Sequence, residues 1–205
     1  PDDVPCEIVA VIADTDAPGL EAAAERGLAV FTVRAEEYPN KAAHEAAIIT
    51  IIEDTGAENI FLAGYMRLLS ASFCERFAHH LFNIHPSLLP RHKGLDTHAR
   101  ALAAGDKTHG CSVHLVSPEM DEGLVLAQRE VPILSADTPQ TLAARVLAEE
   151  HKLYPALLGA LCTGLLTINY GQDSATKGMK ASPQIDMNIG MLPGLIDGTT
   201  ARWPV

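Results

Sequence analysis

The stretch Leu-Phe-Asn-Ile-His-Pro-Ser-Leu-Leu-Pro-Arg, residues 81–91, decides how the rest of the chain is interpreted. Its apolar beginning predicts a buried strand that carries Asn83 and His85, and Pro86 ends that strand because proline supplies no N–H to a ladder. Asn83 and His85 are two residues apart, so on a strand both side chains point to the same side. A carboxamide and an imidazole held together at a strand end can polarise a carbonyl group and move a proton. An isolated Asn-x-His is more often a turn asparagine beside a buried histidine, so the flanking sequence has to decide.

The composition is that of an acidic globular chain. Its 205 residues carry a formal net charge of −11 and 47% are hydrophobic, which fits one large domain with a sizeable core. An acidic chain is a poor ligand for a phosphate backbone, so no nucleic-acid partner is expected. No apolar run approaches the roughly 20 residues that span a bilayer, and no signal peptide is visible. We therefore expect a cytoplasmic protein without a membrane partner, whose first residue, Pro1, is consistent with a processed, truncated or rearranged start.

Neither the cysteines nor the histidines form a metal-binding pattern. The four cysteines are Cys6, Cys74, Cys111 and Cys162. They are scattered and form no C-x-x-C pair, so we expect buried thiols in a reducing compartment instead of disulfides or a zinc site. The histidine-rich stretch from His92 to His114 has neither a His-Glu-x-x-His motif nor Cys/His ligand spacing. The sequence therefore predicts no catalytic metal.

Predicted strands alternate with predicted helices along most of the chain. The strands are expected at residues 7–13, 29–33, 59–63, 81–85, 111–116 and 125–131, and the helices at residues 20–26, 40–55, 70–77, 96–104 and 138–162. The alternation predicts an α/β fold, a mostly parallel twisted sheet with helices on both faces. Ligands bind such sheets beyond the carboxyl ends of the strands, so Gly64, His85 and the turn at residues 117–123 can converge there. Beyond Thr167 the polar, Gly- and Pro-containing sequence predicts a linker and an irregular tail.

Two further segments carry residues suited to a site. Ala-Gly-Tyr-Met-Arg-Leu-Leu, residues 63–69, follows a predicted strand, and its glycine lets a ligand approach the backbone while Tyr65, Met66 and Leu68 could wall an apolar slot. Gly-Cys-Ser-Val-His, residues 110–114, predicts a strand, and Glu-Met-Asp-Glu-Gly, residues 119–123, predicts a turn. Asp121 would ordinarily be a solvated turn residue. If it reaches His85, it would orient the imidazole and favour its charged form.

Together these motifs resemble the phosphoribosylglycinamide formyltransferases of purine biosynthesis. The resemblance rests on Asn-Ile-His-Pro-Ser-Leu-Leu-Pro at residues 83–90, preceded by residues 63–69 and followed, in the same order, by residues 110–114, Met-Asp-Glu-Gly at residues 120–123 and the helix at residues 148–155. It covers residues 7–168, and the wider formyltransferase group shares only parts of it. It implies a Rossmann-like formyltransferase domain in residues 1–168, followed by a linker and tail in residues 169–205.

The family resemblance also implies a reaction and a site. The amine of glycinamide ribonucleotide would attack the formyl carbon of 10-formyltetrahydrofolate, without a metal, in a monomer or homodimer. Asn83 would hydrogen-bond the formyl oxygen, His85 would stabilise the oxyanion or shuttle a proton, and Asp121 would assist His85. The folate-binding positions fall on Lys41, Met66, Arg67, Leu68, Leu69, Asn83, Ser117, Pro118, Glu119, Met120 and Asp121, and the ribonucleotide-binding positions on Gly64 and Glu150. Lys41 stands where the family usually has arginine, and Leu147 where a glutamine contact can sit, so both contacts depart from the family pattern.

The main departure from the family lies at the ends of the chain. The family's first strand, its Gly-x-Gly-Ser-Asn phosphate loop and its first helix have no counterpart before Glu7. One hypothesis is a circular permutation or rearrangement that moved this unit into the tail, because residues 195–200 look like the end of that helix and Met179 like an original start. Against it, residues 184–194 contain no Gly-x-Gly-Ser-Asn. The hypothesis predicts that Ile185 pairs beside the strand at residues 7–13.

Two competing functions fit the same residues. A formyltetrahydrofolate hydrolase would use water in place of the amine, and a folate-binding relative could have lost catalysis along with the phosphate loop. A transfer RNA formyltransferase is disfavoured by the acidic charge and by the lack of a second, basic domain.

Overall fold

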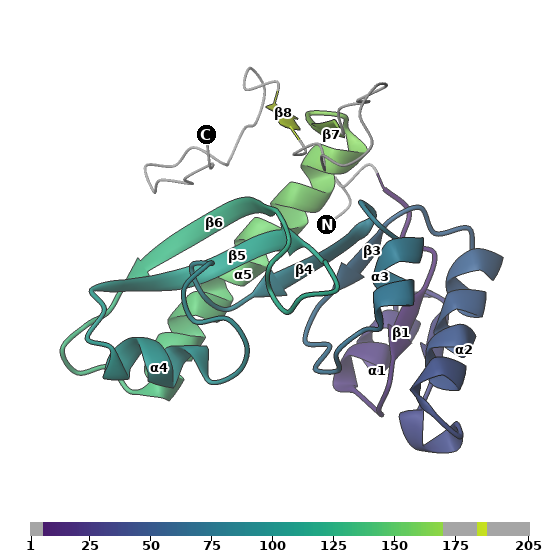
Figure 1. Ribbon diagram of the computed structural model, residues 1–205, viewed down its shortest axis with the longest axis horizontal. Helices are drawn as coiled ribbons and strands as arrows, with labels where there is room; N and C mark the ends of the chain where they lie inside the picture. Colours follow the sequence, from purple (N-terminus) through teal and green to yellow (C-terminus); the bar gives the residue numbers. More distant parts are fainter. Residues whose placement is uncertain (1–5, 170–183, 188–205) are drawn as a thin grey trace.

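The computed structural model describes residues 6–169 and 184–187, and shows the expected α/β architecture (Figure 1). The strands are β1 (Val11–Ala13), β2 (Val30–Thr32), β3 (Ile60–Leu62), β4 (Leu81–His85), β5 (Thr108–Leu115), β6 (Val125–Pro132), β7 (Leu166–Asn169) and β8 (Gln184–Met187). The helices are α1 (Pro18–Ala24), α2 (Lys41–Asp54), α3 (Ala71–Arg76), α4 (Thr97–Ala103) and α5 (Pro139–Cys162), with one 3-10 turn at Ala35–Glu37. In the part of the chain so described, no helix is long and apolar enough to cross a membrane.

The sheets are mixed, where the sequence predicted a mostly parallel one. Strand β1 pairs with β2 in parallel, and β3 with β4 in parallel, but β4 with β5 and β5 with β6 are antiparallel in the order β3-β4-β5-β6. The connection between β5 and β6 spans only residues 116–124 and contains no helix, whereas a parallel pair needs a crossover of a dozen or more residues. The α/β class is therefore confirmed, with a hairpin in place of a further crossover.

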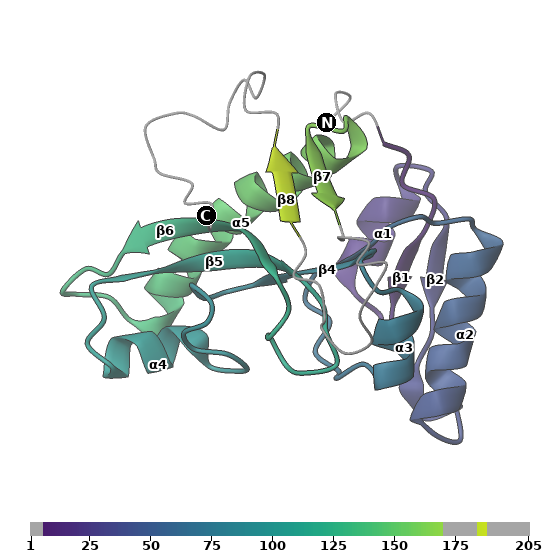
Figure 2. The same cartoon turned by 45° about the horizontal axis from the view of Figure 1, so that its top comes forward.

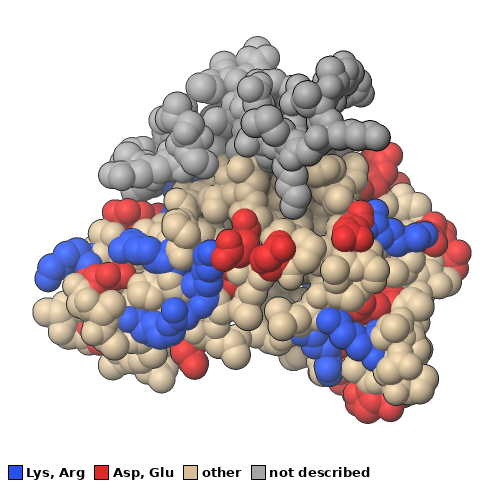
Figure 3. Space-filling view, viewed as in Figure 1, with Lys and Arg blue, Asp and Glu red and all other residues tan. Residues whose placement is uncertain are grey.

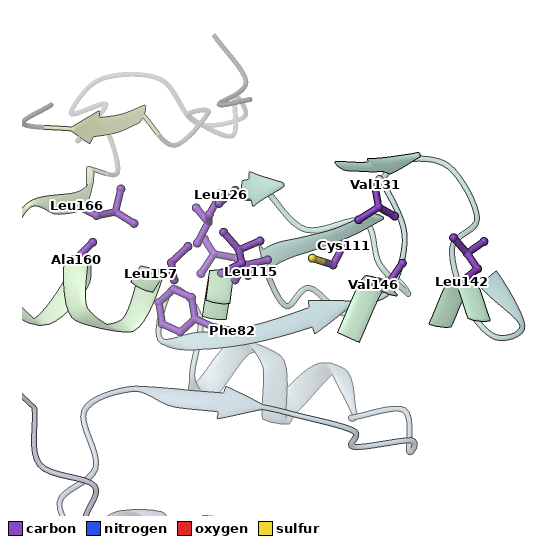
Figure 4. Close-up of a cluster of buried hydrophobic side chains, with 13 residues drawn as sticks. Phe82, Cys111, Leu115, Leu126, Val131, Leu142, Val146, Leu157, Ala160 and Leu166 are labelled. Atoms are coloured by element: carbon purple, nitrogen blue, oxygen red, sulfur yellow. The ribbon is translucent and has the colours of Figure 1, made fainter. Parts of the chain in front are cut away.

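Helix α5 supplies the main core by covering one face of the strands β4–β6 (Figure 1). The buried side chains of this core include Phe82, Cys111, Val113, Val146 and Leu153, and Figure 4 shows several of them converging between the helix and the strands. Strand side chains alternate between faces. Because Phe82 faces α5, its neighbours Asn83 and Leu81 face the other way. The helix that forms the core thus leaves the predicted site residues on the opposite face.

Three predicted helix starts are confirmed by side-chain caps. Asn40 Oδ1 accepts a hydrogen bond from the N–H of Ala43 (2.9 Å), and Ser70 Oγ accepts one from Phe73 (3.2 Å). Thr138 forms a reciprocal capping box with Thr141, with Pro139 at the first position of α5. Such caps satisfy N–H groups that have no partner inside the helix.

The tail contains regular structure that the sequence analysis did not predict. Strands β7 and β8 form an antiparallel pair, drawn side by side in Figure 2. Ile185 pairs with Ile168 of β7, so the prediction that it lies beside the strand at residues 7–13 is wrong. Within the described residues nothing supports a circular permutation, and the segments around Met179 and at residues 195–200 lie outside them. Glycine and proline on both sides of residues 184–187 argued against regular structure there, so this strand of four residues was not predicted.

The cysteine prediction is half wrong. Cys6 and Cys162 form a disulfide with a Cα–Cα distance of 5.8 Å, whereas Cys74 and Cys111 are free and buried as expected. The disulfide joins the segment before β1 to the last residue of α5. Its partners are 156 residues apart, so no local spacing pattern could have paired them.

Candidate active site

Strand β4 places Asn83 and His85 on the face that α5 leaves open. Asn83 lies opposite Leu62 of β3 on one side and His114 of β5 on the other. His85 is 6% exposed and is the last residue of the strand, as the following proline predicted. The loop that begins at residue 63 leaves β3 directly after Leu62, so it starts beside Asn83.

A buried histidine orients the amide of Asn83. The Nδ1–H of His114 donates to the carbonyl oxygen of Leu115 (2.8 Å), which leaves Nε2 as a lone-pair acceptor. Asn83 Nδ2 lies 3.1 Å from this nitrogen and donates to it. His114 is 2% exposed, and its burial lowers its pKa, so the ring stays neutral and keeps this tautomer. An amide NH₂ has two hydrogens, so Asn83 retains one for a ligand.

His85 and Asp121 meet on the same face, as the family resemblance implied. His85 Nδ1 lies 3.5 Å from Asp121 Oδ2, and His85 Nε2 donates to the backbone carbonyl of His92 (3.1 Å). The carbonyl can only accept, so Nε2 carries the hydrogen and Nδ1 is the nitrogen that faces the carboxylate. Asp121 has a left-handed backbone (φ 53°), and its Oδ2 also accepts from the N–H of Gly94 (2.8 Å). The imidazole and the carboxylate are thus each held by a backbone group.

The predicted folate segment at residues 63–69 presents apolar side chains to solvent. Met66 and Leu68 are 75% and 61% exposed, whereas Leu69 packs into a second core between the helices α2 and α3. Arg67 Nε donates to Asp14 (2.6 Å), and this bond raises the pKa of the guanidinium. Exposed large apolar side chains side by side are typical of a binding surface.

Helix α2 holds the end of this segment. Glu45 is 4% exposed, and its Oε1 accepts from the backbone N–H of Ser70 (2.9 Å) while Oε2 accepts from the Ser70 hydroxyl. Lys41, one turn earlier, lies 3.7 Å from the same carboxylate. Glu45 therefore links Lys41, a predicted folate contact, to Ser70, the residue that follows the predicted folate segment.

The predicted second wall, residues 117–120, is a turn beside Asp121. Ser117 Oγ donates to the carbonyl oxygen of Glu119 (3.0 Å), and Pro118 and Glu119 are exposed. Met120 is 50% exposed, and its sulfur would lie 3.3 Å from a methyl group placed on Gly94. The turn therefore brings an exposed apolar side chain to the backbone group that binds Asp121.

Glu150 is set apart from these residues. It lies on α5, and its half-buried position raises its pKa. Burial raises the pKa of Cys111, on the helix-facing side of β5, and the charge of Glu150 adds to that rise. The hydroxyl of Tyr154, one turn further along α5, lies 2.9 Å from the carbonyl oxygen of Leu62 and 3.1 Å from that of Phe82, and its single hydrogen can serve either. Glu150 is therefore one helical turn from the strand ends that carry the site, on the other side of the sheet from His85.

The groups that fix Asn83, His85 and Asp121 were not among the predicted site residues. The backbone of His92 and Gly94 cannot be identified from residue types, because any residue supplies the same carbonyl or N–H. A signal was present for His114: the alternating polar residues Ser112 and His114 lie in an otherwise buried strand and share one face. Among the described residues, no group of three or more His, Cys, Asp or Glu side chains could hold a metal ion.

Charged side chains outside this site are largely paired. Lys and Arg are interspersed with Asp and Glu over the face drawn in Figure 3. Arg91 lies 3.3 Å from Asp106, and Lys93 lies 2.6 Å from Glu122.

The fold and this arrangement of amide, imidazole and carboxylate define a formyl transferase. A family model described as formyl transferase matches residues 2–158, and the chain belongs to that family. Within it, the chain belongs to the phosphoribosylglycinamide formyltransferases. The phosphoribosylglycinamide formyltransferase of Escherichia coli is 40% identical over 154 residues, which cover 75% of this chain and 73% of the relative.

Solved structures agree with this assignment. The phosphoribosylglycinamide formyltransferase of Brucella melitensis is 48% identical, with a TM-score of 0.74 over 80% of this chain and 85% of its own. That of Coxiella burnetii, in complex with CHES, is 37% identical, with a TM-score of 0.80 over 91% and 82%. A formyltetrahydrofolate deformylase from Burkholderia mallei is 28% identical, with a TM-score of 0.70 over 78% and 57%. The transferases are thus more similar than the deformylase both in sequence and in share of length.

Proposed function

We infer that this chain transfers the formyl group of 10-formyltetrahydrofolate to the amine of glycinamide ribonucleotide, a step of purine biosynthesis. Membership of the phosphoribosylglycinamide formyltransferase family supports the reaction. The observation that carries the proposal is the remaining N–H of Asn83, held beside the His85–Asp121 pair.

We assign the tasks from the hydrogen-bonding capacity of each residue. When the amine attacks the formyl carbon, the carbonyl oxygen becomes an oxyanion, and the free N–H of Asn83 donates to it. His85 takes the proton that the amine loses on Nδ1, or, when protonated there, donates to the same oxygen. Asp121 accepts that proton or holds the imidazolium, since its Oδ2 lies 3.5 Å from Nδ1. The formyl group leaves the folate nitrogen, which takes up a proton, so no net charge is created.

The folate is proposed to bind between the two exposed apolar segments. Met66 and Leu68 form one wall and Met120 the other, with Arg67, Leu69, Lys41 and residues 117–119 as flanking contacts. Gly64 and Glu150 are proposed for the ribonucleotide. Gly64 has a left-handed backbone (φ 68°) and nothing within 4 Å of an added Cβ, so its backbone is open to a ligand. We propose residues 1–168 as the catalytic domain, with residues 169–205 as an appended segment; the match at residues 2–158 supports the first boundary.

The proposal is tested by following loss of the formyl group from 10-formyltetrahydrofolate spectrophotometrically, with and without glycinamide ribonucleotide. Turnover that requires the ribonucleotide is the expected result. Turnover at the same rate without the ribonucleotide would replace the transferase by the hydrolase. Folate binding with no turnover under either condition would contradict both and favour a non-catalytic relative.

A further inference from the structure

The loop from Pro86 to His92 begins and ends at the same imidazole. It leaves β4 immediately after His85, and at its far end the carbonyl of His92 accepts the Nε2–H of His85. The position of that carbonyl fixes which ring nitrogen carries hydrogen and how the ring is turned. Whatever holds the loop therefore also orients His85.

Two polar side chains from neighbouring strands hold this loop. Ser112 pairs with His85 across β4 and β5, and Gln128 pairs with Ser112 across β5 and β6, so the three lie in one row of the sheet and point to one face. Ser112 Oγ donates to the carbonyl oxygen of Ser87 (2.6 Å) and accepts from the N–H of Leu89 (3.0 Å) and from Gln128 Nε2 (2.8 Å). Gln128 Nε2 uses its second hydrogen on the carbonyl oxygen of Leu89 (2.9 Å).

These bonds use the full hydrogen-bonding capacity of the Ser112 hydroxyl and both hydrogens of the Gln128 NH₂ group. A hydroxyl has one hydrogen and two lone pairs, and all three are engaged at Ser112, which is completely buried. Within the loop, Ser87 Oγ donates to the carbonyl oxygen of Arg91 (2.7 Å), which tightens the turn that leads back to His92. An apolar residue at position 112 would leave the Ser87 carbonyl and the Leu89 N–H with only their mutual contact of 3.2 Å, and one at position 128 would remove the donor to the Leu89 carbonyl.

The loop depends on these bonds because part of its surface is not packed. A pocket of about 340 Å³ is lined by residues 88–91 together with Gln128 and Glu130. On that side the backbone borders open space. On the other side Leu88 approaches Gly110, where an added Cβ would lie 2.9 Å from it.

We propose that Ser112 and Gln128 are positioning residues that act on His85 through the loop and the His92 carbonyl. Neither side chain touches the reacting atoms. Loss of either displaces the carbonyl, so His85 loses its fixed tautomer and orientation. The kinetic consequence rests on the proposed function, because it requires His85 to take part in formyl transfer; the structural consequence does not.

The test compares Ser112→Ala with Ser112→Thr, which keeps the hydroxyl, and with Val113→Ala, a neighbouring buried residue that faces α5. Two kinds of measurement are made. One gives kcat, and KM for the folate, at saturating ribonucleotide; the other gives the ¹⁵N shifts of the His85 ring in the whole protein. We expect Ser112→Ala to lower kcat about 10- to 100-fold, the size of effect that a misplacement of about 1 Å can cause. KM should change little, and the ring signals should move toward averaged tautomers. Ser112→Thr should restore both, and Val113→Ala should change neither.

Gln128→Met keeps the test decisive if Ser112→Ala does not fold. Gln128 is only half-buried and methionine has a similar length, so the same kcat and ¹⁵N changes are expected in smaller measure. Folded variants with wild-type His85 signals would overturn the positioning role. If wild-type protein showed no transfer, the proposed function would fail, yet the ¹⁵N comparison would still decide whether these residues orient His85.

Discussion

Exchanging Asn83 for aspartate keeps the shape of the side chain but removes its donor and adds a negative charge, whereas exchanging it for alanine removes the donor without adding a charge. Asparagine and aspartate have the same shape, but the carboxylate has no hydrogen to give to an oxyanion or to His114 Nε2. Removing one oxyanion donor costs about 10²–10³ in kcat, or roughly 2.7–4 kcal/mol. We expect Asn83→Asp to fall in this range, and Asn83→Ala to fall about as far.

The two variants should differ in how their stability depends on pH. In Asn83→Asp, a carboxylate oxygen would face the lone pair of His114 Nε2 at about the present 3.1 Å. Protonation of His114 turns this repulsion into an ion pair, so the pKa of His114 is higher in Asn83→Asp than in Asn83→Ala. The stability that this adds to Asn83→Asp is present at low pH, where His114 is protonated, and is lost as pH rises through the folded pKa. Asn83→Ala creates no such pair.

The assay measures thermal unfolding of both variants at pH 5 and pH 8, together with kcat. Asn83→Asp should gain stability relative to Asn83→Ala on going from pH 8 to pH 5. A pH-independent difference would contradict the tautomer assigned to His114, and a kcat within threefold of wild type would refute the donor role of Asn83.

Three further predictions test other parts of the site. His85→Ala or Asp121→Ala should lower kcat by about 10²–10⁴-fold with the melting temperature little changed; an unaltered kcat in the Asp121 variant would remove it from the mechanism. Glu45→Gln should weaken the hold on Ser70, cost about 1–3 kcal/mol in chemical unfolding, and raise KM for the folate more than KM for the ribonucleotide; equal changes in both KM values would count against it. Burial lowers the pKa of His109 to about 4, so the unfolded state binds more protons and stability should fall as pH drops from about 6.5 to 4, and His109→Gln should flatten this slope in unfolding curves.

Features that depend on local chemistry could be predicted from the sequence. The helix starts at Asn40, Ser70 and Thr138 could be predicted, because polar side chains there can satisfy helix N–H groups. The strand carrying Asn83 and His85 was predicted because an apolar run ends at a proline. In each case the deciding neighbours lie within a few residues.

Features that depend on distant partners could not be predicted in this way. The antiparallel β5–β6 pair depends on how two strands meet, and the Cys6–Cys162 disulfide joins residues 156 apart. The role of His114 could not be predicted, because it depends on which residue of β4 lies opposite it. The pairing register of the strands therefore determines which residues of the separate motifs meet in the site.

The histidines and the aspartate of the site share one feature: each forms a hydrogen bond with a backbone atom that orients it and, for the histidines, sets which ring nitrogen carries the hydrogen. The fixed pairs are His114 with the Leu115 carbonyl, His85 with the His92 carbonyl, and Asp121 with the Gly94 N–H. A backbone carbonyl accepts and an N–H donates regardless of the side chain attached. Each imidazole is therefore left with one defined nitrogen, which on His114 accepts from the Asn83 amide and on His85 faces Asp121, while Asp121 keeps further lone pairs besides the one that binds Gly94.

A residue can therefore contribute its backbone to the site while its side chain does something else. The side chain of His92 lies 2.7 Å from Asp106 and serves the loop, while its carbonyl serves His85. Exchanging that side chain should therefore matter only as far as the loop moves. The carbonyl therefore depends on two sets of bonds: the one that the His92 side chain makes itself, and those of Ser112 and Gln128, which bind the loop at Ser87 and Leu89.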